Sequence, residues 1–190
     1  MQTSNFMRAA LAATALSVAT LSFSAPAFAQ DNPTVGGAAM MADMTIVENA
    51  SKAPNLSTLV AAVKAAGLVE TLGGEGPFTV FAPTNEAFEA LPEGTVENLL
   101  KPENKEMLTK VLTAHVLPAK ATSEAAMGMI KDDGGKHNVT TVSGDALTLQ
   151  MEGDKLVVID ESGNAATVTT ADVMQSNGVV HVIDKVLLPK

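Results

Sequence analysis

The spacing of apolar residues along the chain changes once, from a helical period to a period of two. In the first half, Leu56, Leu59, Val60 and Val63 recur three or four positions apart, which places their side chains on one face of a helix. Two later stretches show the same spacing. We therefore predict helices over 56–66, 103–113 and 123–130.

In the second half, apolar and polar residues alternate, and turn residues separate the runs. Leu147, Leu149 and Met151 alternate with Thr148 and Gln150, as in a strand with one buried face and one solvated face. Helices followed by antiparallel hairpins are typical of an α+β fold. The predicted strands cover 137–142, 147–151, 156–159, 165–169 and 179–183.

The stretch from Phe78 to Phe88 joins a strand to a helix and contains three of the six Phe residues of the chain. Pro83 has no N–H to donate, so it ends the strand, and Thr84 is placed to cap the helix that follows. The chain has no Trp or Tyr. We expect this stretch to form the centre of the core.

The first 29 residues have the pattern of a secretory signal peptide. A polar start carries Arg8, an apolar run follows, and Ala27 and Ala29 form a small-x-small cleavage site. We predict a signal peptide over 1–29, cleavage between Ala29 and Gln30, a flexible N-terminal tether over 30–41 and one domain over 42–190. No later segment is long and apolar enough for membrane insertion after cleavage. The predicted location is periplasmic or secreted.

The charge and the composition of the chain exclude several classes of function. The formal net charge is −9 at pH 7, and Arg8 belongs to the predicted signal peptide, so no Arg remains after cleavage. Arg is the preferred side chain for phosphate and base edges, which argues against a nucleic-acid partner. The chain has no Cys, which excludes disulfides, thiol catalysis and zinc–thiolate sites.

The remaining polar residues give no pattern of catalysis or cofactor binding. His115, His137 and His181 are far apart in the sequence, and no two of them have the spacing that places metal ligands on one element. The sequence also has no Gly-x-Ser-x-Gly nucleophile motif and no Gly-rich phosphate loop. We therefore expect no metal, no cofactor and no enzymatic activity.

Two long blocks of the sequence resemble the signature blocks of fasciclin-like domains. The first runs from Thr79 to Phe88 and the second from Asn177 to Pro189, in the order and separation of that family. The resemblance covers about residues 42–190, and it implies a wedge-shaped antiparallel β-sandwich with helices packed along it. The signature residues are Phe81, Ala82, Pro83, Thr84, Phe88, Asn177, Gly178, His181 and Asp184.

The resemblance also implies a binding role. Animal members of the family use a Tyr-His pair and an Asp-Ile pair in cell adhesion. Here Ala114 replaces the Tyr before His115, and Val173 replaces the Ile after Asp172. The expected partner-binding residues are therefore His115, Asp172, Val173 and Met174.

Two functions are compatible with these observations. The first is an exported, monomeric, single-domain adhesion or binding module that interacts with a surface protein or glycan. The alternative is a carrier of an apolar small molecule, a lipid or a pigment, because the resembling family includes pigment-binding members. The side chains expected to line an apolar groove are Leu117, Met127, Met129 and Ile130.

Overall fold

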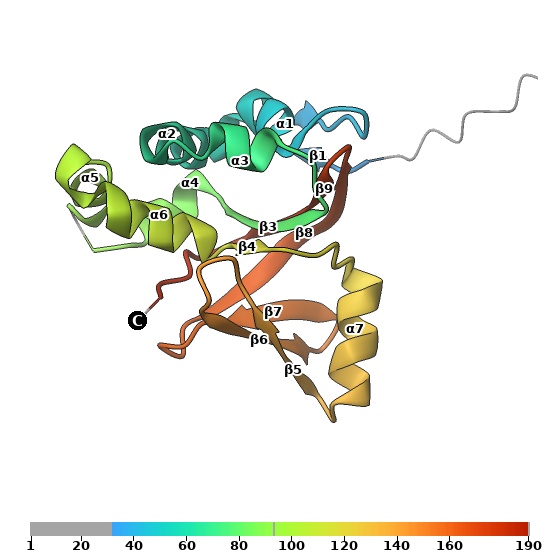
Figure 1. Cartoon of the computed structure of the whole chain (residues 1–190). Helices are drawn as coiled ribbons and strands as arrows, with labels where there is room; N and C mark the ends of the chain where they lie inside the picture. Colours follow the sequence, from blue (N-terminus) through green and yellow to red (C-terminus); the bar gives the residue numbers. More distant parts are fainter. Residues whose placement is uncertain (1–31, 93, 190) are drawn as a thin grey trace, which may run out of the picture.

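A mixed sheet of seven strands runs through the part of the chain that the computed structural model describes, residues 32–92 and 94–189. Its strand order is β4-β3-β9-β8-β7-β6-β5, and helices pack against it (Figure 1). This arrangement confirms the α+β class. The strands are β3 Phe78–Pro83, β4 Val116–Leu117, β5 Lys136–Thr140, β6 Ala146–Glu152, β7 Lys155–Ile159, β8 Ala165–Gln175 and β9 Gly178–Ile183.

Most helices come before β4 in the sequence, and α7 connects β4 to β5. The capping box of Thr45 and Glu48 begins α1, and Gly67, in the left-handed conformation at φ 77°, ends α2. The three helices predicted from spacing are present. The helices are α1 Ile46–Lys52, η1 Pro54–Leu56, α2 Ser57–Ala66, α3 Val69–Gly73, α4 Asn85–Glu89, α5 Thr95–Leu99, η2 Pro102–Asn104, α6 Lys105–Thr113 and α7 Ser123–Asp132.

The two signature blocks lie side by side as the second and third strands of the sheet. Strands β3 and β9 pair in parallel, with Phe81 opposite His181 and Pro83 opposite Ile183. The other strand pairs of this sheet are antiparallel. The parallel pair of β3 and β9 thus departs from the antiparallel arrangement that the resemblance implied.

Two hydrophobic cores lie on opposite faces of β3 and β9. Helices α1 to α6 cover one face and bury Val80 and Val182 from the sheet. On the other face, Phe81 and Ile183 pack with α7 and with side chains of β6 and β7. Figure 1 shows the helical layer above β3 and the folded-over strands β5 to β7 below it. Alternate side chains of one strand therefore hold two layers together.

The sheet curls until its two edges meet. After β5, the N–H of Val142 donates to the carbonyl of Val116 in β4 at 2.8 Å. These strands are the first and last of the sheet order. The strands β5 to β7 are thereby held over the second core, which accounts for the sandwich arrangement.

The segment before α1 differs from the expected flexible tether. It forms a small hairpin of β1, Thr34–Val35, and β2, Ala38–Ala39. Val35 and Met40 are only 3% and 5% exposed and belong to the first core. The tether prediction is therefore wrong over 32–41, because two isolated apolar residues show no periodicity. Residues of the predicted cleavage site, Ala27, Ala29 and Gln30, lie outside the described residues.

Candidate functional site

The expected partner-binding residue Asp172 lies at an irregularity of β8. The register with β9 shifts between Thr170 and Val173, and Asp172 has a φ of 55°. It is the one non-glycine residue with positive φ in the described chain. Asp tolerates this left-handed conformation better than most side chains do. The irregularity turns its carboxylate toward the start of α7.

The Asp172 carboxylate holds the first turn of α7. One oxygen accepts a hydrogen bond from the N–H of Ser123 at 2.7 Å, and the other accepts from the Ser123 hydroxyl. Thr122 caps the same helix by accepting from the N–H of Ala125 at 3.2 Å. A carboxylate at a helix N-terminus is also favoured by the helix dipole. Asp172 therefore fixes the position of α7 relative to β8.

The signature residue His181 links this irregularity to the second core. Its Nδ1 accepts from the N–H of Asp172 at 3.3 Å, and its Nε2 lies 2.8 Å from the carbonyl of Ala121. These partners require a neutral ring with the proton on Nε2. Burial lowers the pKa of His181. The ring stacks on Phe81, with centroids 5.7 Å apart and an interplanar angle of 28°.

A hydrolase triad uses the residue types of Ser123, Asp172 and His181. Here, however, the hydrogen bonds among these three residues do not run in the sequence that catalysis requires. The Ser123 hydroxyl bonds to Asp172 and not to the imidazole. Both ring nitrogens of His181 are occupied by main-chain groups. A triad requires the imidazole to accept the proton of the nucleophile. These three side chains therefore position α7 and have no catalytic geometry.

His115 lies three strands away from Asp172 across the sheet and faces the interior. Its Nδ1 is 2.7 Å from the carbonyl of Val111, and its Nε2 accepts from the N–H of Leu187 at 3.0 Å. Burial lowers the pKa of His115 to about 4. Across the neighbouring strands β4, β3, β9 and β8, Phe81 and His181 lie between His115 and Asp172. The backbones of His115 and Asp172 are thus three strand spacings apart, which corresponds to roughly 14 Å.

The four expected partner-binding residues therefore do not form one surface. His115 and Val173 are 2% and 0% exposed, so a partner cannot touch them in this conformation. Asp172 and Met174 are half-buried and reach the surface. The two exposed members lie on β8, beside Ser123.

Asn177 and Gly178, which open the second signature block, have a structural role. The amide group of Asn177 donates to the carbonyls of Leu72 and Gly74 at 2.8 and 2.9 Å. Its oxygen accepts from the N–H of Ile46 at 3.1 Å. A Cβ on Gly178 would lie 2.0 Å from the carbonyl oxygen of Phe78. This corner joins α1 and α3 to the sheet.

The other signature residues also stabilise the fold. Thr84 caps α4 by accepting from the N–H of Ala87 at 3.3 Å. The Asp184 carboxylate accepts from the N–H of Thr167 at 2.7 Å. Three further members, Ala82, Pro83 and Phe88, are buried. The signature thus describes the scaffold, and the exposed candidate surface lies outside it.

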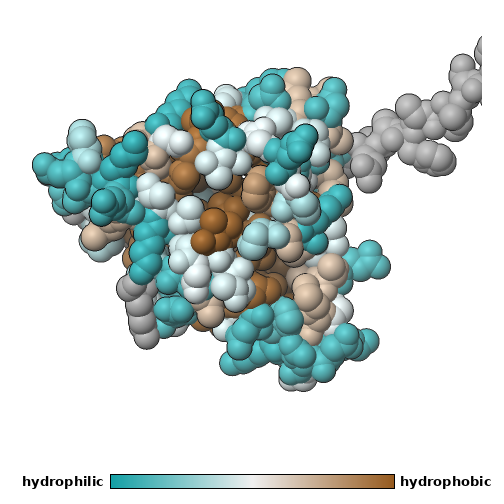
Figure 2. Space-filling model, viewed as in Figure 1, coloured by the Kyte–Doolittle hydropathy of each residue, from teal (hydrophilic) through white to brown (hydrophobic). Residues whose placement is uncertain are grey.

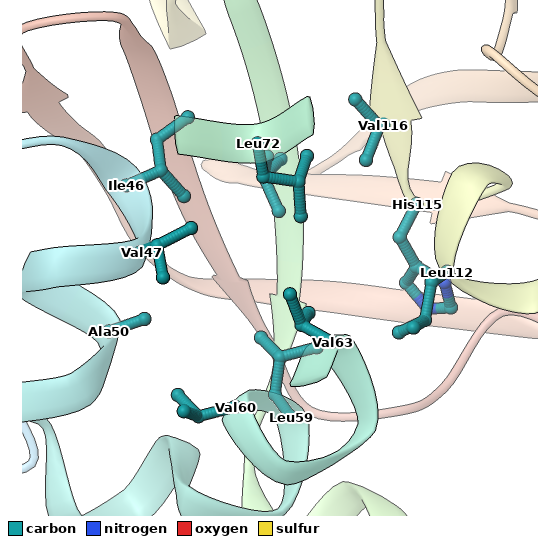
Figure 3. Close-up of a pocket in the computed structure, with 11 residues that line it drawn as sticks. Ile46, Val47, Ala50, Leu59, Val60, Val63, Leu72, Leu112, His115 and Val116 are labelled. Carbon is teal, nitrogen blue, oxygen red and sulfur yellow. The ribbon is translucent and has the colours of Figure 1, made fainter. Parts of the chain in front are cut away.

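An apolar cavity lies between the helices and the sheet. Its side chains come from α1, α2, α3, α6 and β3, together with His115 and Val116, and Figure 3 shows those drawn turned toward one space. On the side of the molecule that Figure 2 shows, apolar residues also reach the surface in the middle, between hydrophilic areas. The cavity volume is about 30 Å³, whereas sites for organic ligands typically occupy roughly 300–1,000 Å³.

The residues expected to line a carrier groove do not line this cavity. Leu117 and Ile130 are buried in the second core, and Met127 is 41% exposed on α7. Met129 is half-buried on the same helix. Of these four residues, Met127 lines a separate, open groove of about 490 Å³ beside β8.

Within residues 32–92 and 94–189, no three His, Asp or Glu side chains come close enough to hold a metal ion. The third histidine, His137, pairs through Nδ1 with the carboxylate of Asp133 at 2.5 Å. His115, His137 and His181 have separate partners and do not converge. In the same part of the chain, every helix is too short or too polar to cross a bilayer.

Comparison with known proteins agrees with this architecture. The family model described as Fasciclin domain matches residues 54–189. Protein sll1483 of Synechocystis sp. is 49% identical over 180 residues, which cover 95% of this chain and 93% of that protein. The cell surface glycolipoprotein MPB83 of Mycobacterium bovis is 37% identical over 168 residues, which cover 85% of this chain and 69% of that protein.

A solved structure shares the fold at lower sequence identity. It is a FAS1 domain pair from the insect cell adhesion molecule fasciclin I, and the TM-score is 0.68 at 20% identity. The match covers 76% of this chain and 51% of the other chain. This likeness concerns the fold alone.

Proposed function

The chain belongs to the fasciclin domain family, and we propose on that premise that it is an exported adhesion or binding module that attaches to a protein on a cell surface or in a matrix. The observation that carries the proposal is the family match over 54–189, together with an irregular strand that exposes Asp172 and Met174. The name of one similar protein, a cell surface glycolipoprotein, supports it.

The proposed mechanism is attachment without chemistry. The polar side chains around Asp172 hold one another and the backbone, and none is free to act as a nucleophile. The proposed site of action is the periplasm or the medium, which is consistent with the signal-peptide pattern of the sequence. We propose that the module works as a monomer and has no cofactor.

A protein partner is favoured over a glycan. Aromatic faces offer sugar rings large, rigid contact surfaces, but the chain has no Trp or Tyr. Of the three Phe residues described, Phe81 and Phe88 are buried and Phe78 is half-buried. A glycan would therefore find at most one partly open Phe ring in the described part of the chain.

Retention of a surface protein by the immobilised, purified chain tests the proposal. We expect an envelope or matrix extract to contain a protein that is retained by the wild type, and Asp172→Ala to weaken its binding about tenfold, as for a central contact. Because Asp172 also positions α7, Ser123→Ala is the matched control. It removes the hydroxyl bond and keeps the carboxylate.

The two variants separate direct contact from positioning. If Asp172 touches the partner, Asp172→Ala weakens binding far more than Ser123→Ala does. Equal weakening would show that Asp172 acts through α7. If the wild-type chain retained no protein from any surface extract, the proposed function would be wrong.

A further inference from the structure

One edge of β8 is largely uncovered. β7 pairs with β8 from Ala165 to Thr167, although β8 continues to Gln175. At the far end, the side chain of Asn32 bonds to the N–H and the carbonyl of Met174. Between these two points, no strand in the described chain pairs with this edge. Open strand edges carry backbone groups that can pair with another chain.

A groove of about 490 Å³ follows the open edge. Its apolar lining comes from Met127 of α7, Met151 and Leu156 of the β6–β7 hairpin, and Val168 and Ala171 of β8. This volume falls within the roughly 300–1,000 Å³ that is typical of ligand sites. The paired part of β8 ends at Thr167 on the β7 side, and the first register shift between β8 and β9 follows Val168.

The apolar lining is the margin of the second core. Leu156 and Val168 belong to that core, and Met151 and Ala171 pack against it. Met127 is 41% exposed at the groove. Methionine side chains are flexible and adapt to different apolar partners. An aliphatic side chain entering the groove would therefore meet a surface that is already apolar and adaptable.

The charges at the groove favour a basic occupant. The carboxylates of Asp154 and Asp184 and the ammonium group of Lys155 line it. The balance is negative, as is the formal net charge of −9 for the whole chain. Opposite charge speeds association and selects the partner.

We propose that this groove binds an extended, basic segment of the partner protein as an added strand along β8, with one aliphatic side chain between Met127 and Met151. Main-chain hydrogen bonds to the β8 edge supply affinity, and the methionines and carboxylates supply selectivity. Ser123 lines the groove and bonds to Asp172, so the groove lies next to the Asp172 carboxylate. The inference rests on the proposed function and adds the mode of recognition.

Selection of random seven-residue peptides on the purified chain provides the test. We expect the enriched peptides to carry an aliphatic residue flanked by Lys or Arg. Met127→Asp should weaken their binding about tenfold or more, since it places a charge in the apolar part of the groove. Met107→Asp is the matched control, because Met107 is a 60% exposed methionine on α6, away from the groove. This variant should bind like the wild type.

Two further measurements are specific to strand addition. N-methylation of alternate peptide amides should reduce binding about tenfold, because it removes the donors on one edge. Binding of the unmodified peptide should slow hydrogen exchange of the backbone amides over 168–171. No enriched peptide, equal binding by Met127→Asp, equal binding of the methylated peptide, or unchanged exchange at these amides would each overturn the proposal.

Retention of the surface protein tests the proposed function separately from the groove. If Met127→Asp still retains the surface protein fully, the module binds by another surface and only the groove inference is wrong. If the wild-type chain retains no surface protein, the proposed function itself is wrong, whatever the peptides show.

Discussion

Single residues of this fold act mainly by satisfying buried main-chain groups. Asn177 serves two carbonyls and one N–H, and His115 and His181 each bind backbone groups at both ring nitrogens. Buried polar groups without partners are costly, so each of these side chains replaces water that the core excludes. Sequence patterns that mark such residues therefore indicate architecture more directly than they indicate binding.

The contrast between two glycines tests this view. A Cβ on Gly178 would lie 2.0 Å from a backbone oxygen that cannot easily move, so Gly178→Ala should lower the free energy of unfolding by about 3 kcal/mol. Gly128 lies in α7 with no atom near its missing Cβ. Gly128→Ala should raise stability by about 0.5–1 kcal/mol. Urea unfolding of both variants measures the difference, and a loss below about 1 kcal/mol at Gly178 would contradict the described packing.

Acid should destabilise the fold through its buried histidines. Burial lowers the pKa of His115 from 6.5 to about 4, and burial also lowers the pKa of His181. Between pH 6.5 and 4, the unfolded chain binds a proton that the folded His115 excludes. The contribution of His115 to the free energy of unfolding is therefore complete above pH 6.5. As the pH drops from 6.5 to 4, the free energy of unfolding falls by about 3 kcal/mol on account of His115.

Urea unfolding at a series of pH values measures this decline, and the NMR titration of the His115 ring locates it. His137→Gln is the control, since it removes the histidine that pairs with Asp133 outside the two cores. The decline should persist in that variant. A His115 ring that titrates near pH 6.5 in the folded protein would contradict the buried, neutral state.

At the scale of elements, periodicity predicted the three longest helices and most strands, but not the extent of β8. The alternating pattern predicted a strand over 165–169, whereas β8 continues to Gln175 through two register shifts. Those shifts break the period of two, so the second half of the strand has no clear signal. The exposed part of the candidate site lies in this half. Asp172 was predicted from family resemblance, but its bond to Ser123 and the groove beside it required the three-dimensional structure.

The position of α7 should depend on its bond to β8. Ser123→Ala removes the hydroxyl bond to Asp172 and keeps the N–H bond, so the free energy of unfolding should fall by about 1 kcal/mol. Hydrogen exchange should quicken in α7 more than in α2. Ser176→Ala, at an exposed position outside α7, should change neither quantity appreciably. Equal exchange rates in α7 of the wild type and Ser123→Ala would show that the hydroxyl bond to Asp172 does not hold this helix.

At the scale of the whole molecule, the sequence predicted the class of the fold but placed the start of the packed structure too late. The apolar anchors Val35 and Met40 stand alone among small and polar residues, and such isolated residues give no periodic signal. The parallel pairing of β3 with β9 was also not predicted, because nothing local to either strand specifies a distant neighbour.

Two adjacent methionines distinguish a packed hairpin from a tether. Met40 is 5% exposed and lies in the first core, so Met40→Ala should lower the free energy of unfolding by about 2–5 kcal/mol. Met41 is 45% exposed, and Met41→Ala should change the free energy of unfolding by less than about 0.5 kcal/mol. Thermal or urea unfolding of the two variants gives the answer. A flexible tether would leave both variants as stable as the wild type.

The parallel contact between β3 and β9 has a consequence for the order of events during biosynthesis. This contact joins Phe78–Pro83 to a strand about a hundred residues later in the sequence, Gly178–Ile183. Long-range pairing of this kind is slow, because the entropy cost of closing a large loop comes before the stabilising contacts form. A chain still emerging from the ribosome therefore lacks β9, and β3 stays without its parallel partner until that strand has been made. For the export proposed above, in which the chain crosses a membrane unfolded, this delay would keep the chain competent for transport.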